Sequence, residues 1–236
     1  MKTIKNLIIL SFLACATRSK LEATYPLLPK PDRDETVVCL HGFMRNHWSM
    51  GRIENFMTNE GFRVYNHNYP SRDKEIEAHG YDLTLILRSI ASNHPGRPIH
   101  FITHSMGALV ARAAINHPNC PLEAKTGKAV LFAPPNQGSA FGRSLRSLEP
   151  VRWAVGDQAG RQLIEKDSFK DLGDFPDSMD VLIIAGEYDG KVAIEETRLD
   201  RPHELYVAPR GHSLIMYDRP SIRKAKDFLI GKRVDE

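Results

Sequence analysis

Three side chains that together could perform nucleophilic catalysis occur in the order serine, acid, histidine. Ser105 lies at the centre of Thr-His-Ser-Met-Gly, between a short apolar run and an alanine-rich segment. A serine hydroxyl is a weak nucleophile unless a histidine accepts its proton and a carboxylate orients that histidine. Asp189 and His212 each follow a later apolar run. The order therefore predicts a catalytic triad that attacks a carbonyl carbon.

Each of these residues also has a purely structural interpretation. Ser105 could be the N-cap of a helix, and Asp189 is followed by glycine in a common turn pair. Any one of the ten histidines, His212 included, could be an ordinary surface or core residue. Glu187 is the alternative acid, because it lies closer to the end of the same apolar run.

Acyl transfer through a tetrahedral intermediate also needs N–H donors for the developing oxyanion. The N–H of Met106, directly after Ser105, is one candidate. The second should come from His41-Gly42-Phe43, where glycine permits a sharp turn after an apolar run. We assign it to the backbone of Phe43, although His-Gly-Phe taken alone could be an ordinary strand-ending turn.

Alternating strands and helices must position these residues. The pattern predicts an α/β fold, with a doubly wound, mostly parallel sheet of about six strands and helices on both faces. The crevice of such a sheet lies at the carboxyl ends of the strands, where the candidate residues fall. Strands are expected at 36–40, 62–69, 99–102, 128–132, 181–185 and 205–207, and helices near 53–60, at 75–93, at 106–115 and from Pro220.

The segment at residues 134–178 contains no predicted strand, which is a long connection for a compact domain. It carries Phe141, Leu145 and Trp153 among several arginines. Two interpretations are equally consistent with this pattern. The segment could be a helical lid or specificity segment over the site, or a structural helical excursion that covers a sheet edge.

The first sixteen residues have the pattern of an export leader. Lys2 and Lys5 precede a short apolar run, and small residues follow around Cys15. The apolar run is too short to span a bilayer. We prefer lipidation of Cys15 because the leader is short, while cleavage after Ala16 and an uncleaved, membrane-associated or partly buried segment are the alternatives.

The predicted organisation is a leader at 1–16, a proline-rich linker at 17–35 and one domain at 36–236. We expect export, either to the cell envelope through Cys15 or to the periplasm or medium. The formal charge of +3 is small, and basic residues are interleaved with acidic ones, which gives no case for nucleic-acid binding. The three cysteines show no spacing typical of a disulfide framework or a metal site.

Taken together, these stretches resemble the α/β-hydrolase superfamily, and more narrowly its small lipase/esterase-like serine hydrolases. The matching motifs are Val-Cys-Leu-His-Gly-Phe, Phe-Ile-Thr-His-Ser-Met-Gly, Gly-Glu-Tyr-Asp and Gly-His-Ser, and they span the chain from about Thr36 onward. Thr103 replaces the first glycine of the family's Gly-x-Ser-x-Gly pattern. The resemblance implies the residue roles above and a reduced sheet that lacks the first two strands of the full fold.

The expected activity is hydrolysis of carboxylic esters, either small molecules or lipids, through an acyl-enzyme on Ser105. No metal or organic cofactor is expected. A lipid acyltransferase, an amidase or a thioesterase could use the same triad. A non-catalytic envelope binding protein on this fold is the alternative from another class.

Overall fold

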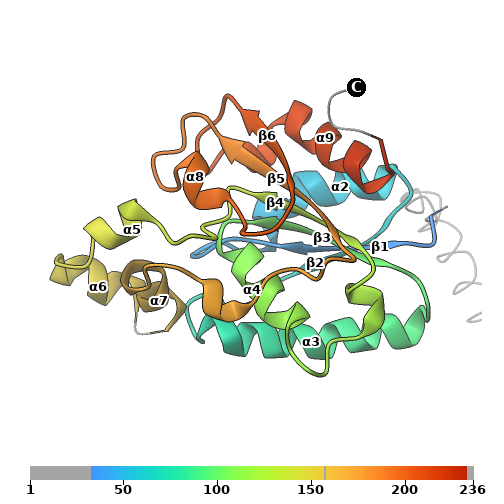
Figure 1. Cartoon of the computed structure of the whole chain (residues 1–236), viewed down its shortest axis with the longest axis horizontal. Helices are drawn as coiled ribbons and strands as arrows, with labels where there is room; N and C mark the ends of the chain where they lie inside the picture. The colour runs from blue at the N-terminus through green and yellow to red at the C-terminus, as the bar shows by residue number, and fades with distance from the viewer. Residues whose placement is uncertain (1–32, 157, 233–236) are drawn as a thin grey trace, which may run out of the picture.

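A six-stranded parallel sheet forms the centre of the computed structural model, which describes residues 33–156 and 158–232 (Figure 1). The strand order is β2-β1-β3-β4-β5-β6, and every neighbouring pair is parallel. The doubly wound fold class is therefore confirmed. The strands are β1 (Thr36–Leu40), β2 (Arg63–His67), β3 (Ile99–His104), β4 (Lys128–Phe132), β5 (Asp180–Gly186) and β6 (Glu204–Ala208).

Helices cover both faces of this sheet. On one face lie α2 (Gly51–Asn59) and α9 (Arg219–Leu229), and on the other α3 (Ile76–Asn93) and α4 (Met106–Ile115) (Figure 1). Successive side chains of a strand point to opposite faces, so Val38 and Leu40 join one apolar core while Val37 and Cys39 join the other. The inner strands are buried on both sides, which explains their continuous apolar sequences.

Shorter helices are η1 (His47–Met50), η2 (Leu122–Ala124), α8 (Ile194–Thr197) and η4 (Ile215–Tyr217).

The ends of the helices follow local sequence signals. Gly61 adopts a positive φ of 87° just after α2, a conformation that glycine adopts without strain. Asp218 caps α9, since its side chain accepts the N–H of Ser221 at 3.0 Å, and Pro220 occupies the first turn of that helix.

The segment at 134–178 forms three short helices and a 3-10 turn beyond the carboxyl ends of the strands (Figure 1). These are α5 (Ala140–Ser144), α6 (Glu149–Val155), α7 (Ala159–Glu165) and η3 (Lys170–Leu172). Gln162 Oε1 accepts the N–H of Ile76 at 2.8 Å, and the N–H of Ala159 donates to Lys74 at 3.1 Å. The segment is thus attached to the start of α3 and lies across the end of the sheet that carries the candidate residues.

The leader at 1–16, including Cys15, and residues 17–32 of the linker lie outside the described residues. Within the described part, no helix is long and apolar enough to cross a membrane, and no group of three or more His, Cys, Asp or Glu side chains could hold a metal ion. Cys39 and Cys120 are buried and free.

Gly107 provides a test of how closely α4 packs on β1. A Cβ atom at this position would lie 2.6 Å from the Leu40 carbonyl oxygen and 2.8 Å from that of His41. We predict that Gly107→Ala lowers the free energy of unfolding by about 1–3 kcal/mol, because the backbone of β1 would have to shift. Urea denaturation of both proteins measures the change.

Gly51→Ala is the matched control, because a Cβ at Gly51 in α2 would have no neighbour within 4 Å. It should leave stability unchanged or raise it by about 0.5–1 kcal/mol. Equal denaturation midpoints for the two variants would contradict the close approach of α4 to β1.

Candidate functional site

Ser105 lies at the sharp turn between β3 and α4. Its backbone has φ 51° and ψ −124°, which few non-glycine residues adopt. The N–H of Ser105 donates to the Phe132 carbonyl at 2.8 Å, and its own carbonyl accepts the N–H of Ala108 at 3.0 Å. This turn directs the side chain to the carboxyl edge of the sheet, where it lines a cavity.

The structure brings Ser105, His212 and Asp189 into one hydrogen-bonded chain. His212 Nε2 lies 3.0 Å from Ser105 Oγ, and His212 Nδ1 lies 2.7 Å from Asp189 Oδ2. A neutral histidine that donates from Nδ1 to the carboxylate leaves Nε2 free to accept the serine proton. The three side chains come from the ends of β3, β6 and β5, which the parallel sheet places at one edge.

The carboxylate of Asp189 is fully enclosed, with 0% of its side chain exposed. Its second oxygen accepts the backbone N–H groups of Lys191 at 2.8 Å and Val192 at 3.0 Å. A buried charge is costly without such partners, and here each oxygen has at least one donor. Glu187, the alternative acid, is exposed, and it is Asp189 that contacts His212.

The loop after β1 brings Phe43 to the same cavity. A Cβ atom on Gly42 would lie 2.8 Å from His104 Nδ1 and 3.2 Å from Ser105 Cβ, so the close approach of the loop requires glycine. Tyr69 holds the loop by donating its hydroxyl to the His41 carbonyl at 2.6 Å. Within residues 33–156 and 158–232, the N–H groups of Phe43 and Met106 have no protein acceptor and remain available to a ligand.

The cavity beside Ser105 and His212 has a volume of about 230 Å³ and a largely apolar wall. Side chains from both the loop after β1 and the segment at 134–178 form it. The cationic side chains at its lining are Arg45 and Lys191. Its apolar lining residues include Phe43, Met44, Phe141, Leu145, Val155, Leu163 and Ile164.

His104 is a site residue that sequence reasoning missed. It is only 2% exposed, and its Nε2 lies 2.9 Å from the backbone carbonyl oxygen of His212. Burial, followed by the nearby His212, lowers the pKa of His104 well below the usual range for histidine. The neutral ring can therefore donate from Nε2 and tie the loop of His212 to β3. The sequence feature that could have identified His104 as a site residue is its position directly before Ser105.

A stack of aromatic and imidazole rings lies beneath the loop after β1. Tyr69 stacks on His41 with ring centroids 4.3 Å apart and on His67 at 5.5 Å, and it meets His79 at 5.0 Å. Burial lowers the pKa of His41 and His79, and burial with the neighbouring histidines lowers that of His67 to about 4. These rings are therefore packed in their neutral forms.

Thr103, which replaces the expected glycine, fits within the end of β3. It pairs with Leu40 on one side and Leu131 on the other, and its side chain is fully buried. Its Oγ1 atom has no hydrogen-bond partner in the described part of the chain. The substitution thus leaves a buried hydroxyl unsatisfied, while the turn at Ser105 is still formed.

Residues 37–223 match the family model described as the alpha/beta hydrolase family. The chain belongs to the α/β-hydrolase family. This match covers most of the chain and includes the ends of all six strands, so the expected resemblance is confirmed. Hydrolases are accordingly the class of enzyme that the comparison supports.

Solved structures of a lipase and of an esterase share the fold at low sequence identity. The mature form of Bacillus licheniformis lipase BlEst2 is 17% identical with a TM-score of 0.67, and the match covers 86% of this chain and 95% of that one. Its propeptide form is 16% identical with a TM-score of 0.71 over 87% of this chain, but the match spans only 52% of that protein. Pyrococcus furiosus esterase PF2001 is 20% identical with a TM-score of 0.63, over 85% and 83% of the two chains. No curated protein matches the sequence.

The half-buried His67, with the buried His41 and His79 beside it, predicts a loss of stability in mild acid. Because the pKa of His67 is about 4 in the folded chain and about 6.5 when unfolded, the unfolded chain binds more protons between these values. The free energy of unfolding should therefore fall as the pH is lowered from 7 to 4.5, which denaturation at a series of pH values measures. His67→Gln should flatten this dependence, whereas His94→Gln, at the partly exposed end of α3, should not. An identical pH dependence in all three proteins would contradict the prediction.

Proposed function

We propose that this protein is a serine hydrolase that cleaves carboxylic esters through an acyl-enzyme. The observation that carries the proposal is the unbroken hydrogen-bonded chain from Ser105 through His212 to Asp189. In this proposal Ser105 is the nucleophile, His212 the base and then the acid, and Asp189 the group that orients the imidazole.

The reaction proceeds in two halves. Ser105 Oγ attacks the ester carbonyl carbon while His212 Nε2 accepts the hydroxyl proton. The intermediate collapses, the carbon–oxygen bond to the alcohol breaks, and the alcohol leaves with the proton from His212. Water then loses a proton to His212 and attacks the acyl-enzyme, which releases the carboxylic acid and returns the proton to Ser105.

The N–H groups of Phe43 and Met106 hold the oxyanion of each tetrahedral intermediate. Met106 is the first residue of α4, where the positive end of the helix dipole adds to the stabilisation of a negative charge. Their N–H groups are fixed before the substrate binds, which is what makes such donors effective in a transition state. His104 acts as a positioning residue, since it holds the backbone of His212 at 2.9 Å.

The apolar wall of the cavity favours an ester with an apolar acyl group. Phe141, Leu145 and Leu163 from the segment at 134–178 form part of this wall, so the segment is the specificity element of the proposal. The structural neighbours include one protein named as a lipase and one named as an esterase, and also the phospholipase PlaB from Legionella pneumophila, with 13% identity and a TM-score of 0.54. Both lipid esters and small soluble esters fit this chemistry.

Ser105→Ala tests the proposal directly. We predict that it reduces kcat for aryl esters by about 10⁶-fold, because the acyl-enzyme can no longer form. Aryl esters of increasing acyl length should be measured with the wild type and the variant, together with labelling by a fluorophosphonate probe. Ser105→Ala must retain the circular dichroism spectrum of the wild type.

Retained hydrolysis in Ser105→Ala would remove the serine from the mechanism. A wild-type protein that neither cleaves any ester nor reacts with the probe would favour a non-catalytic binding function. Adding an alcohol in competition with water distinguishes a hydrolase from an acyltransferase, since only the latter forms mostly the new ester. Rates of hydrolysis of amides and thioesters with the same acyl group distinguish an esterase from an amidase and from a thioesterase.

Asp189→Asn tests which acid supports His212. The amide cannot stabilise the imidazolium and can hold the wrong tautomer, so kcat should fall on the order of 10⁴-fold. Glu187→Gln is the control on the same loop, because Glu187 is exposed and lies outside the hydrogen-bonded chain. Its kcat should remain within about twofold of the wild type. A larger loss in Glu187→Gln than in Asp189→Asn would reverse the assignment.

A further inference from the structure

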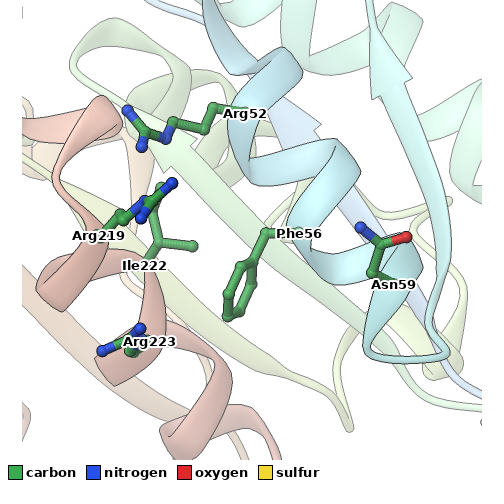
Figure 2. Close-up of a pocket in the computed structure, with 6 residues that line it drawn as sticks. All are labelled: Arg52, Phe56, Asn59, Arg219, Ile222 and Arg223. Carbon is green, nitrogen blue, oxygen red and sulfur yellow. The ribbon is translucent and has the colours of Figure 1, made fainter.

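A second cavity lies between α2 and α9, on one face of the sheet. It has a volume of about 340 Å³ and combines an apolar floor with arginines, and we call it the α2–α9 groove. Figure 2 shows side chains from both helices in the space between them. The groove is lined by Arg52, Phe56 and Asn59 from α2 and by Arg219, Ile222 and Arg223 from α9. None of these residues lines the cavity beside Ser105.

The three arginines of the α2–α9 groove lack anionic partners. Within residues 33–156 and 158–232, no carboxylate lies in ion-pair distance of Arg52, Arg219 or Arg223, and their guanidinium groups make no hydrogen bond to protein. The acidic side chains of this region have other partners. Glu54 binds Asn66, Asp218 binds Arg210 and Ser221, and Glu60 and Asp227 pair with Lys226.

Two of these arginines also occupy unfavourable places on their helices. Arg52 lies in the first turn of α2, and Arg219 is the first residue of α9. The helix dipole places partial positive charge at these ends. Glu54 in the first turn of α2 and Asp218 at the N-cap of α9 already have Asn66 and Arg210 as partners, so Arg52 and Arg219 add positive charge there. All three arginines of the groove are exposed to solvent. A bound anion would be attracted both by the positive ends of the two helices and by the arginines.

We propose that the α2–α9 groove binds a phosphate monoester whose substituent is apolar. A carboxylate ligand would bring one negative charge and two acceptor oxygens to the three guanidinium groups. A phosphate monoester brings a charge of about −1.5 to −2 and three acceptor oxygens, so it matches the arginines better. Phe56 and Ile222 form the apolar floor on which the substituent would lie. The same chemical group occurs in soluble phosphate esters and in the headgroup of phosphatidic acid.

Calorimetric titration of the full-length protein with phenyl phosphate and with inorganic phosphate tests this site. Phenyl phosphate should bind at least tenfold more tightly than inorganic phosphate, because only the former reaches the apolar floor. Arg219→Gln and Arg223→Gln should each weaken binding at least tenfold. Phe56→Leu should reduce the preference for phenyl phosphate while leaving inorganic phosphate binding unchanged. Arg88→Gln is the matched control, since Arg88 is an exposed arginine on α3, on the opposite face of the sheet.

Flotation with vesicles of phosphatidylcholine, with or without phosphatidic acid, identifies the source of the phosphate group. Binding only to vesicles that contain phosphatidic acid, lost in Arg219→Gln and Arg223→Gln, supports the site with a lipid ligand. Binding of phenyl phosphate with the same variant dependence supports it with a soluble ligand. The proposal is overturned if neither probe binds, or if Arg88→Gln weakens binding as much as the groove variants. Thermal melting of each variant establishes that it is folded, and the Ser105→Ala variant should bind as the wild type does.

Discussion

The unfavourable backbone of Ser105 is the constraint on which the geometry of the site depends. A non-glycine residue at φ 51° costs about 1–3 kcal/mol, so the surrounding structure must hold it there. The hydrogen bond from its N–H to Phe132 ties the turn to β4, and Gly107 lets α4 lie directly against the end of β1. Because strands on both sides of β3 take part, the position of the Ser105 side chain is a property of the whole sheet.

Buried polar contacts extend this constraint to the loops that follow β5 and β6 at the same edge of the sheet. The enclosed carboxylate of Asp189 receives His212 Nδ1 and two backbone N–H groups of its own loop, so it fixes that loop and the imidazole together. The neutral ring of His104 fixes the backbone of His212 from the side of β3. The loops after β3, β5 and β6 therefore hold one another in place.

The sequence predicted the sheet and the positions of Ser105, Asp189 and His212 because these depend on local patterns. Continuous apolar runs marked the strands, and a rule about their carboxyl ends placed the three side chains at one edge. The choice of Asp189 over Glu187 depended on the path of a loop, which sequence spacing left open. The contact of His104 with His212 joins residues 108 positions apart through a backbone carbonyl, which no side-chain pattern encodes. The path of the segment at 134–178 likewise depends on tertiary contacts such as that of Gln162 with Ile76.

The topology that supports the proposed oxyanion site also places the starts of α2 and α9, which carry Arg52 and Arg219, at the carboxyl edge of the sheet. In a parallel sheet each connecting helix runs back against the strands, so α2, α4 and α9 all begin at the carboxyl edge. The positive ends of three helix dipoles are thereby gathered on one side of the molecule. At the start of α4 this positive potential acts together with the N–H of Met106, which has no protein acceptor within the described residues. At the starts of α2 and α9 the carboxylates of Glu54 and Asp218 are present as well, and Arg52 and Arg219 add positive charge at the same ends. One arrangement of the backbone thus favours negative charge at both places, in the proposed transition state at the first and in the proposed phosphate ligand at the second.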